Sequence, residues 1–272
     1  MHEAELMDIH KPKPVRSWRE LLTEVGVIVL SVCIALGAEQ AVEWWHWRTQ
    51  VREAREVIAT ELSSNLALAV ARLRTQPCTE RRLDMLALIL DEAAKTGTLP
   101  PLGDIGRPPR GTWPNGAWES VVASQTATHF PRQQLAEIAA AYKLIERLES
   151  FSATEIGDWN QIYTMVGPGR RLDPGSEGAF RKALSEGRQL SRSMASLGLQ
   201  MAIRVKALHL PFSRDDLERI EKAKRPPTSA AQAEICRPVG PVPPSYGNAV
   251  DMGQSVSQGD VNQFPQFNGD AR

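Results

Sequence analysis

The chain has 272 residues, enough for one medium-sized domain or two small ones besides its ends. Its 32 basic and 32 acidic side chains cancel, so no net positive charge favours nucleic acid, and no nucleic-acid partner is expected. With 42% apolar residues and a negative mean hydropathy, the composition excludes a membrane protein with many spans but allows one.

The first predicted element in the chain is a membrane-spanning helix over residues 21–43. Its uninterrupted apolar core, residues 25–38, is shorter than a bilayer requires. Residues 21–42 together give about 33 Å of helix at 1.5 Å per residue, which matches the bilayer hydrocarbon core. Glu24 and Glu39 lie close enough to the ends of this stretch to reach an interface.

Side chains typical of a membrane interface flank this segment. They are Trp18, Arg19, Trp44, Trp45, Trp47 and Arg48. Tryptophans at both borders form a belt that an export signal does not need. The alternative is a cleaved signal, because Ala35-Leu36-Gly37 is a small-x-small pattern that a signal peptidase could cut. A retained anchor is favoured, since Glu20 and Glu24 are unusual in a signal.

One face of the predicted span carries small and polar side chains at spacings of three and four. Its members are Leu21, Glu24, Ile28, Ser31, Ala35, Ala38 and Val42. We define the packing stripe as Glu24, Ile28, Ser31, Ala35 and Ala38. Small residues let two membrane helices approach closely, so the stripe predicts self-association. Alternatively, such residues are common in any span and need no partner. Glu24 is a candidate proton site or partner contact, unless it stays solvated at the interface.

The basic residues orient the span only slightly. Four precede it (Lys11, Lys13, Arg16 and Arg19) and three follow it (Arg48, Arg52 and Arg55). By the positive-inside rule, residues 1–20 form a short cytoplasmic N-terminus and the remaining domain lies across the membrane. In an oxidising compartment Cys78 and Cys236 could form a disulfide, and two free thiols are the alternative. With Cys33 the cysteines number three, too few for a disulfide scaffold and without the spacing of a zinc site.

Apolar residues at helical spacing predict an all-α extramembrane domain over residues 44–224, arranged as an antiparallel bundle without a sheet. The helix that leaves the membrane is predicted to reach about Arg74 and to stop at Gln76-Pro77. A second helix covers about residues 78–95. Further helices are predicted to open at Pro114 and at Pro131, to carry Ile156 to Val166, to run over about 176–210, and to follow a capping box formed by Ser213 and Asp216.

Two segments lack this periodicity. Residues 97–116 contain five prolines and five glycines, and so long a connection is usually functional or disordered. Its polar and aromatic residues, Asp104, Arg107, Arg110 and Trp113, form the candidate loop for a ligand or partner. Residues 225–272 hold seven of the 19 prolines and few apolar residues, which predicts a disordered tail except where Cys236 is tied to Cys78.

The sequence holds no glycine-framed nucleophilic serine, no phosphate-binding loop and no paired-histidine zinc motif. No catalytic residue, metal site or cofactor is therefore predicted, and the chain is not expected to be an enzyme.

The region from Glu24 through Ala35-Leu36 to Trp47-Arg48, followed by Glu61-Leu62-x-x-Asn65-Leu66, resembles a set of uncharacterised bacterial single-pass inner-membrane proteins. The resemblance covers roughly residues 16–70 and departs from the pattern in Gly-Ala-Glu-Gln after Ala-Leu and in the cluster of three tryptophans. It implies a retained anchor in the bacterial inner membrane and supplies no catalytic residues.

These observations predict a membrane-anchored helical interaction or adaptor protein of unknown activity. Its expected partners are the lipid bilayer and either a second copy or another membrane protein. The N-terminus is expected in the cytoplasm and the domain in the periplasm. An extracytoplasmic ligand sensor is the alternative. Only about 20 residues precede the span and leave no room for an output domain, so a sensor would have to signal through a partner, and this favours the adaptor.

Overall fold

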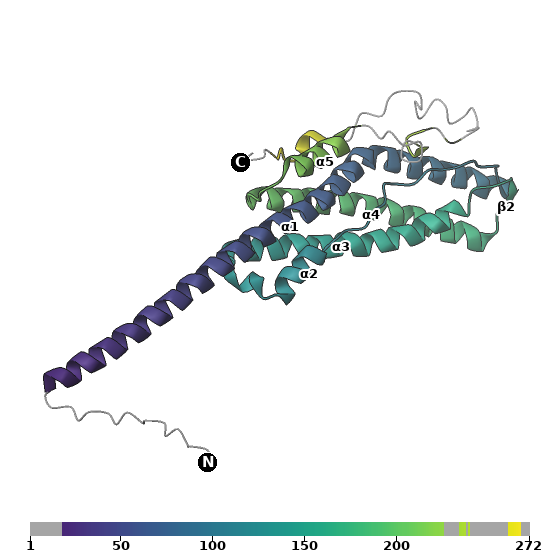
Figure 1. Ribbon diagram of the computed structural model, residues 1–272. Helices are drawn as coiled ribbons and strands as arrows, with labels where there is room; N and C mark the ends of the chain where they lie inside the picture. Colours follow the sequence, from purple (N-terminus) through teal and green to yellow (C-terminus); the bar gives the residue numbers. More distant parts are fainter. Residues whose placement is uncertain (1–17, 226–233, 238, 240–260, 268–272) are drawn as a thin grey trace, which may run out of the picture. The chain divides into compact units, whose positions relative to one another are not determined.

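The computed structural model describes residues 18–225, 234–237, 239 and 261–267 (Figure 1). These residues are mostly helical, which confirms the all-α prediction. The chain divides into two compact units, Met1–Gln50 and Val51–Arg272, and helix α1 (Trp18–Thr96) has residues in both. The second unit also contains α2 (Gly116–Ala123), α3 (Arg132–Tyr163), α4 (Pro174–Ala207), α5 (Arg214–Lys224) and the 3-10 turns η1 (Thr126–His129) and η2 (Val261–Gln263).

Helix α1 continues through Pro77, so the predicted stop at Gln76-Pro77 is wrong. A proline inside a helix removes one backbone hydrogen bond and favours a bend, and the blue part of α1 changes direction in Figure 1. Buried contacts on both sides hold the helix together, because Thr75, Cys78 and Thr79 are all within the interior. The hydroxyl of Thr79 also donates to the Thr75 carbonyl at 3.2 Å. Packing therefore outweighs the local preference to end the helix.

Helix α3 replaces the two helices predicted after Pro131. The buried residues of the two predicted helices form one continuous stripe along it: Ile138, Tyr142, Ile145, Leu148, Glu155, Trp159 and Ile162. Ser152 fills the position between Leu148 and Glu155, and its hydroxyl accepts a hydrogen bond from Trp113 Nε1 at 3.0 Å. The predicted break between these two helices is therefore wrong, because the polar residue at this position has a partner in the interior.

The ends of α4 and α5 are defined by capping side chains. Asp173 caps α4 by accepting a hydrogen bond from the backbone N–H of Ser176 at 2.9 Å. The helix therefore begins at Pro174, two residues before the predicted start at Ser176. At α5, Ser213 and Asp216 form the capping box that the sequence predicted. Asp216 also accepts a hydrogen bond from the Ser63 hydroxyl at 3.0 Å, so this cap fastens α5 to α1.

Three ion pairs fix the register between α1 and α4. Arg181 pairs with Asp91, Arg188 with Asp84 and Arg192 with Glu80, at 2.7, 2.7 and 2.8 Å. Residue numbers rise along one helix as they fall along the other, so the two helices run in opposite directions. Each pair is exposed and contributes little stability alone, but a shift of one helix would break all three together.

A short antiparallel ribbon joins the segment after α1 to the segment before α4. Strand β1 (Thr98–Leu99) pairs antiparallel with β2 (Arg170–Arg171), with Thr98 opposite Arg171. A further bridge joins Leu102 to Gly167. The prediction of no sheet therefore missed one short pairing, because two residues are too few to show an alternating pattern.

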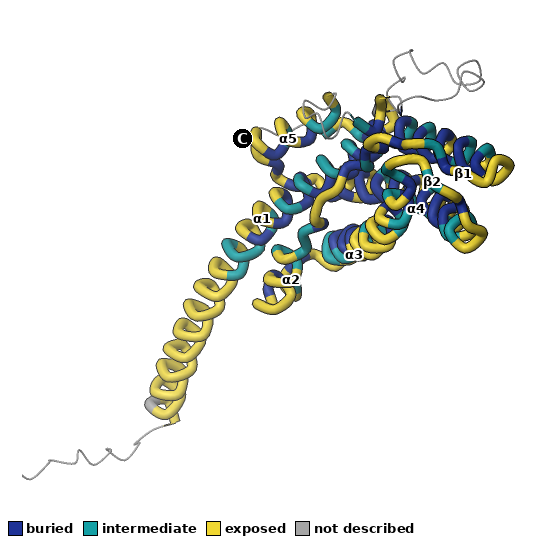
Figure 2. The backbone as a smooth tube through the Cα atoms, turned by 90° about the vertical axis from the view of Figure 1, so that its right-hand side faces the viewer, coloured by how far each residue is buried: buried dark blue, intermediate teal, exposed yellow. Residues whose placement is uncertain are grey.

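Two hydrophobic cores fill the second unit, and Figure 2 shows their buried residues in dark blue. The first contains Leu62, Leu66 and Ile145, and the second contains Leu86, Leu90 and Trp159. Described parts of the C-terminal region contribute to both. Phe264 is buried in the first core, while Ile235 and Val239 are buried in the second. Ile235 and Val239 flank Cys236, where the sequence analysis made an exception to the predicted disordered tail, whereas the burial of Phe264 was not predicted. The rest of 226–272 lies outside the described residues.

Candidate functional site

One helix in the described part of the chain, α1, is long and apolar enough to cross a membrane. That assignment rests on length and composition, and an export signal near the N-terminus meets the same criteria. The packing stripe and the interface residues all lie on this part of α1.

Burial divides α1 into two parts of different character. Trp18, Arg19 and every side chain from Leu21 to His46 are exposed. They include the large apolar side chains of Leu22, Val25, Val27, Ile28, Val29, Leu30, Val32, Ile34, Leu36 and Val42. These positions follow one another along the helix and so cover every side of it. By contrast, the second part buries Ile58, Leu62, Leu66, Leu83, Leu86 and Leu90 completely. A helix that is apolar all round is typical of a membrane span.

The predicted interface residues lie on both sides of this apolar segment. Trp18 and Arg19 are exposed at its start. At its other end the Arg48 guanidinium lies 5.1 Å from the centre of the Trp44 ring. Trp45 is exposed, and Trp47 Nε1 donates to the Glu43 carboxylate at 3.3 Å. These aromatic and cationic pairs have the composition of a membrane border.

The packing stripe lies on one exposed face of α1. Glu24, Ile28, Ala35 and Ala38 are exposed, as is Ser31. The Ser31 hydroxyl donates to the Val27 carbonyl at 2.7 Å, so its hydrogen-bonding capacity is partly satisfied within the helix. Self-association through this face therefore depends on close packing of small side chains, and it stays a prediction.

Cys78 and Cys236 form a disulfide that joins α1 to the C-terminal region, with their Cα atoms 4.8 Å apart. Cys33 is a free, exposed cysteine in the apolar segment. The buried Arg82 side chain lies beside the disulfide and donates through Nη2 to the carbonyls of Glu234, Ile235 and Arg237. Burial lowers the pKa of Arg82, which Glu234 and Asp104 partly offset. The residues around Cys236 are thus tied to α1 by one covalent bond and one arginine.

The candidate loop, residues 97–116, is packed rather than loose. Leu99, Leu102, Ile105, Pro108, Pro109 and Trp113 are buried. Gly106 has φ +66°, and a Cβ atom there would lie 2.5 Å from the backbone nitrogen of Ile235. Only glycine fits this contact, because φ is positive and the C-terminal region lies directly against it. The sequence left this segment as either functional or disordered, and the structure shows that it packs against residues far away in the chain.

The four candidate residues of the loop differ in whether they reach the surface. Asp104 accepts hydrogen bonds from the Gly106 N–H at 2.9 Å and the Tyr163 hydroxyl at 2.8 Å, and these bonds lower the pKa of its carboxyl. The Arg107 guanidinium lies 4.0 Å from the centre of the Tyr163 ring. Asp104, Arg107 and Arg110 reach the surface, whereas Trp113 is part of the first core. The structure therefore keeps two arginines and one carboxylate as candidate contacts and assigns Trp113 a packing role.

A buried ion pair contacts the backbone of the loop. Arg72 Nη2 lies 2.6 Å from Glu155 Oε1, with 7% and 2% of the side chains exposed. Arg72 Nη1 also donates to the Pro109 carbonyl at 2.6 Å. This pair connects α1, α3 and the loop, and sequence spacing alone could not reveal it because its members are 83 residues apart.

The Glu-Leu-x-x-Asn-Leu motif has a structural role that the sequence did not reveal. Glu61 accepts hydrogen bonds from the Ala117 N–H at 2.9 Å and the Tyr142 hydroxyl at 2.7 Å. Burial, followed by the bond to Glu61, raises the pKa of Tyr142. Asn65 donates to the Pro114 carbonyl at 2.8 Å. The two polar residues thus hold the start of α2 while the two leucines enter the first core.

A single carboxyl group between α3 and α4 has an unusual proton affinity. Burial, together with the neighbouring Glu186, raises the pKa of Asp158 to about 6, while Lys182 opposes the effect. Its Oδ2 atom is buried without a hydrogen-bond partner among the described residues. Asp158 is therefore a candidate for titration near neutral pH.

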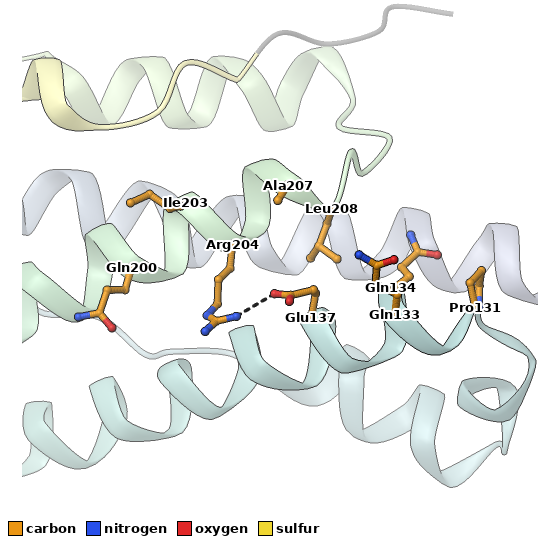
Figure 3. A pocket seen from close by; sticks show the side chains of 9 residues that line it. All are labelled: Pro131, Gln133, Gln134, Glu137, Gln200, Ile203, Arg204, Ala207 and Leu208. Atoms are coloured by element: carbon orange, nitrogen blue, oxygen red, sulfur yellow. Dashed lines mark hydrogen bonds and ion pairs between the residues drawn. The ribbon is translucent and has the colours of Figure 1, made fainter.

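An open groove of about 650 Å³ lies between the start of α3 and the end of α4 (Figure 3). Its lining residues are Pro131, Gln133, Gln134, Glu137, Gln200, Ile203, Arg204, Ala207 and Leu208. The ion pair between Arg204 and Glu137, at 2.8 Å, crosses it. Three amides, one ion pair and the exposed Ile203 could contact a small polar ligand, but the groove contains none of the predicted site residues.

The described residues contain no group of three or more histidine, cysteine, aspartate or glutamate side chains placed to hold a metal ion. We found no match for this chain among protein-family models, curated proteins or solved structures.

Proposed function

We propose that the chain is a single-pass membrane-anchored interaction or adaptor protein, without enzymatic activity, whose helical domain is an antiparallel bundle. The observation that carries the proposal is the exposure of the apolar side chains of α1 on every side between Leu21 and Val42. Exposing so much contiguous apolar surface to water is unfavourable. Removing that surface from water stabilises the protein by about 25 cal/mol per Å². A bilayer supplies that burial over the length of a span.

The proposed location is the bacterial inner membrane, with residues 1–20 in the cytoplasm and the helical domain in the periplasm. The Cys78–Cys236 disulfide supports an oxidising compartment for the domain, because such bonds rarely persist in the cytosol. The packing stripe supports self-association within the membrane.

Intact-mass measurement of a C-terminally tagged chain, purified from membranes washed at alkaline pH, tests the anchor. We expect the full-length mass in the washed membranes, and alkylation before reduction should label only Cys33. A mass that begins near Ala38, in the soluble fraction, would instead identify the apolar segment as an export signal. Alkylation of Cys78 without reduction would contradict the oxidising compartment.

Cross-linking in detergent through a cysteine placed outside the stripe tests self-association. The double substitution Ser31→Leu with Ala35→Leu should reduce dimer formation, because larger side chains separate the helices. The matched control, Val29→Leu with Val32→Leu, enlarges side chains outside the stripe and should leave it unchanged. Equal dimer yields in the two variants would refute this role of the stripe.

A ligand sensor is the alternative function, and the groove in Figure 3 is the observation that favours it. A thermal-shift screen of the full chain in detergent distinguishes the two. Stabilisation by a small molecule that Gln200→Ala abolishes would favour the sensor, whereas copurification of one defined membrane protein would favour the adaptor.

A further inference from the structure

We propose that Arg107 and Arg110 form a binding surface for carboxylate groups on an acidic segment of a partner protein. This inference rests on the proposed function, since it names the surface by which an adaptor recognises its partner. It does not depend on the membrane anchor, because both arginines belong to the helical domain.

Arg107 is held in place by a tyrosine ring rather than by an ion pair with a described residue. Its guanidinium lies 4.0 Å from the centre of the Tyr163 ring, in the geometry of a cation–π contact. The Tyr163 hydroxyl donates to Asp104, which also accepts the Gly106 N–H, so the ring is itself fixed. Arg107 is half-buried, so the residue is partly accessible to solvent.

The backbone on which Arg110 stands is also fixed. Pro108 and Pro109 are buried immediately before it, and the Pro109 carbonyl accepts a hydrogen bond from the buried Arg72. The rings of the two prolines restrict φ, so little freedom remains to be lost on binding. Because these prolines are buried, a partner that recognises proline-rich segments would find no surface here.

The two arginines stand close enough to repel each other. Burial lowers the pKa of Arg110, and the positive charges of Arg107 and Arg72 lower it as well, while the Glu155 carboxylate opposes these effects. Arg72 is neutralised by Glu155. Neither Arg107 nor Arg110 forms an ion pair with a described residue, although Arg181, Arg188 and Arg192 on α4 all do so. Glu155 and Asp104 offset part of this repulsion, and an anion placed between Arg107 and Arg110 would relieve the remainder.

The chemistry of guanidinium identifies the ligand class. Its planar fork binds a carboxylate through two parallel hydrogen bonds, which an ammonium group cannot do. Two forks three residues apart on a fixed backbone match two carboxylates of one peptide segment. Their exposure lets a protein surface reach both at once.

Fluorescence anisotropy with a labelled hexaglutamate peptide tests the proposal. The protein is the full chain in phosphatidylcholine nanodiscs at low salt. We expect saturable binding that weakens about tenfold or more in the double variant Arg107→Gln and Arg110→Gln, since two charge-assisted contacts are lost. The matched control is Lys206→Gln with Arg214→Gln, which removes the same charge from exposed positions outside the ion pairs and should change affinity less than about twofold.

Several results would overturn the proposal. They are an absence of binding by the unchanged protein, equal weakening in the control variant, and displacement of the peptide by inorganic phosphate at the peptide's own concentration. If the glutamine variant does not fold, as judged by circular dichroism, Arg107→Lys with Arg110→Lys replaces it and should bind at least about threefold more weakly than the unchanged protein. Anchoring is measured separately by alkaline extraction, so failure of one proposal is distinguishable from failure of the other.

Discussion

Removal of the Glu155 carboxylate is expected to be among the most destabilising single changes in the helical domain. Glu155 and Arg72 are 2% and 7% exposed, and their charged atoms lie 2.6 Å apart. Nε of Arg72 already lacks a hydrogen-bond partner among the residues that the structure describes. In Glu155→Ala the buried guanidinium would keep only its bond to the Pro109 carbonyl. Leaving one member of a buried pair uncompensated costs about 3–5 kcal/mol.

Thermal unfolding of the full chain in detergent, followed by circular dichroism, measures this loss. For a domain of this size about 1 kcal/mol corresponds to about 2–4 °C, so we expect Tm to fall by about 6–20 °C. The double variant Arg72→Met with Glu155→Met should recover most of the loss, because it removes both charges and keeps the volume filled.

The exposed ion pair of Glu137 and Arg204 provides the matched control, since it also joins a glutamate of α3 to an arginine. Its side chains are 41% and 46% exposed. Glu137→Ala should cost no more than about 1 kcal/mol. A loss in Glu155→Ala as small as this, or no recovery in the double variant, would refute the reasoning.

Two further changes test the loop and the buried carboxyl. Gly106→Ala should lower the free energy of unfolding by about 1–3 kcal/mol in chemical denaturation, because φ is +66° and the new Cβ would meet Ile235; Gly103→Ala, with nothing within 4 Å, is the control and should change it little. Burial raises the pKa of Asp158 to about 6 from its ordinary 3.8, so the folded state binds this proton more tightly and loses stability as pH rises from about 4 to 6. Asp158→Asn should flatten that part of the profile of Tm against pH and raise Tm at pH 7, and an unchanged profile would contradict the assignment.

Local chemistry made much of the helical content predictable. The capping box of Ser213 and Asp216 marks the start of α5 because both partners lie within one helical turn. The apolar run of residues 21–42 identifies a candidate span by length alone. The two apolar runs of α3 were also visible, but their connection involves Ser152, whose partner Trp113 is 39 residues away in the sequence.

The candidate site was only partly predictable. Asp104, Arg107 and Arg110 were identified by their position in a segment rich in proline and glycine, yet the reason they are fixed comes from Tyr163 and Arg72 on other helices. The roles of Glu61 and Asn65 could have been suspected, since two polar residues interrupt the buried face of α1. Their partners, which are Ala117 and Tyr142 for Glu61 and Pro114 for Asn65, could not be read from the sequence.

The sequence by itself determined that the chain is mostly helical, where α5 begins, and that one apolar segment is long enough to span a bilayer. Those properties depend on residues within a few turns of one another. Tertiary structure decided that α1 continues through Pro77, that the loop is packed, and that Ile235 and Phe264 complete the two cores. These outcomes depend on burial between residues far apart in the chain, and that free energy exceeds the local preferences of a proline or a glycine-rich segment.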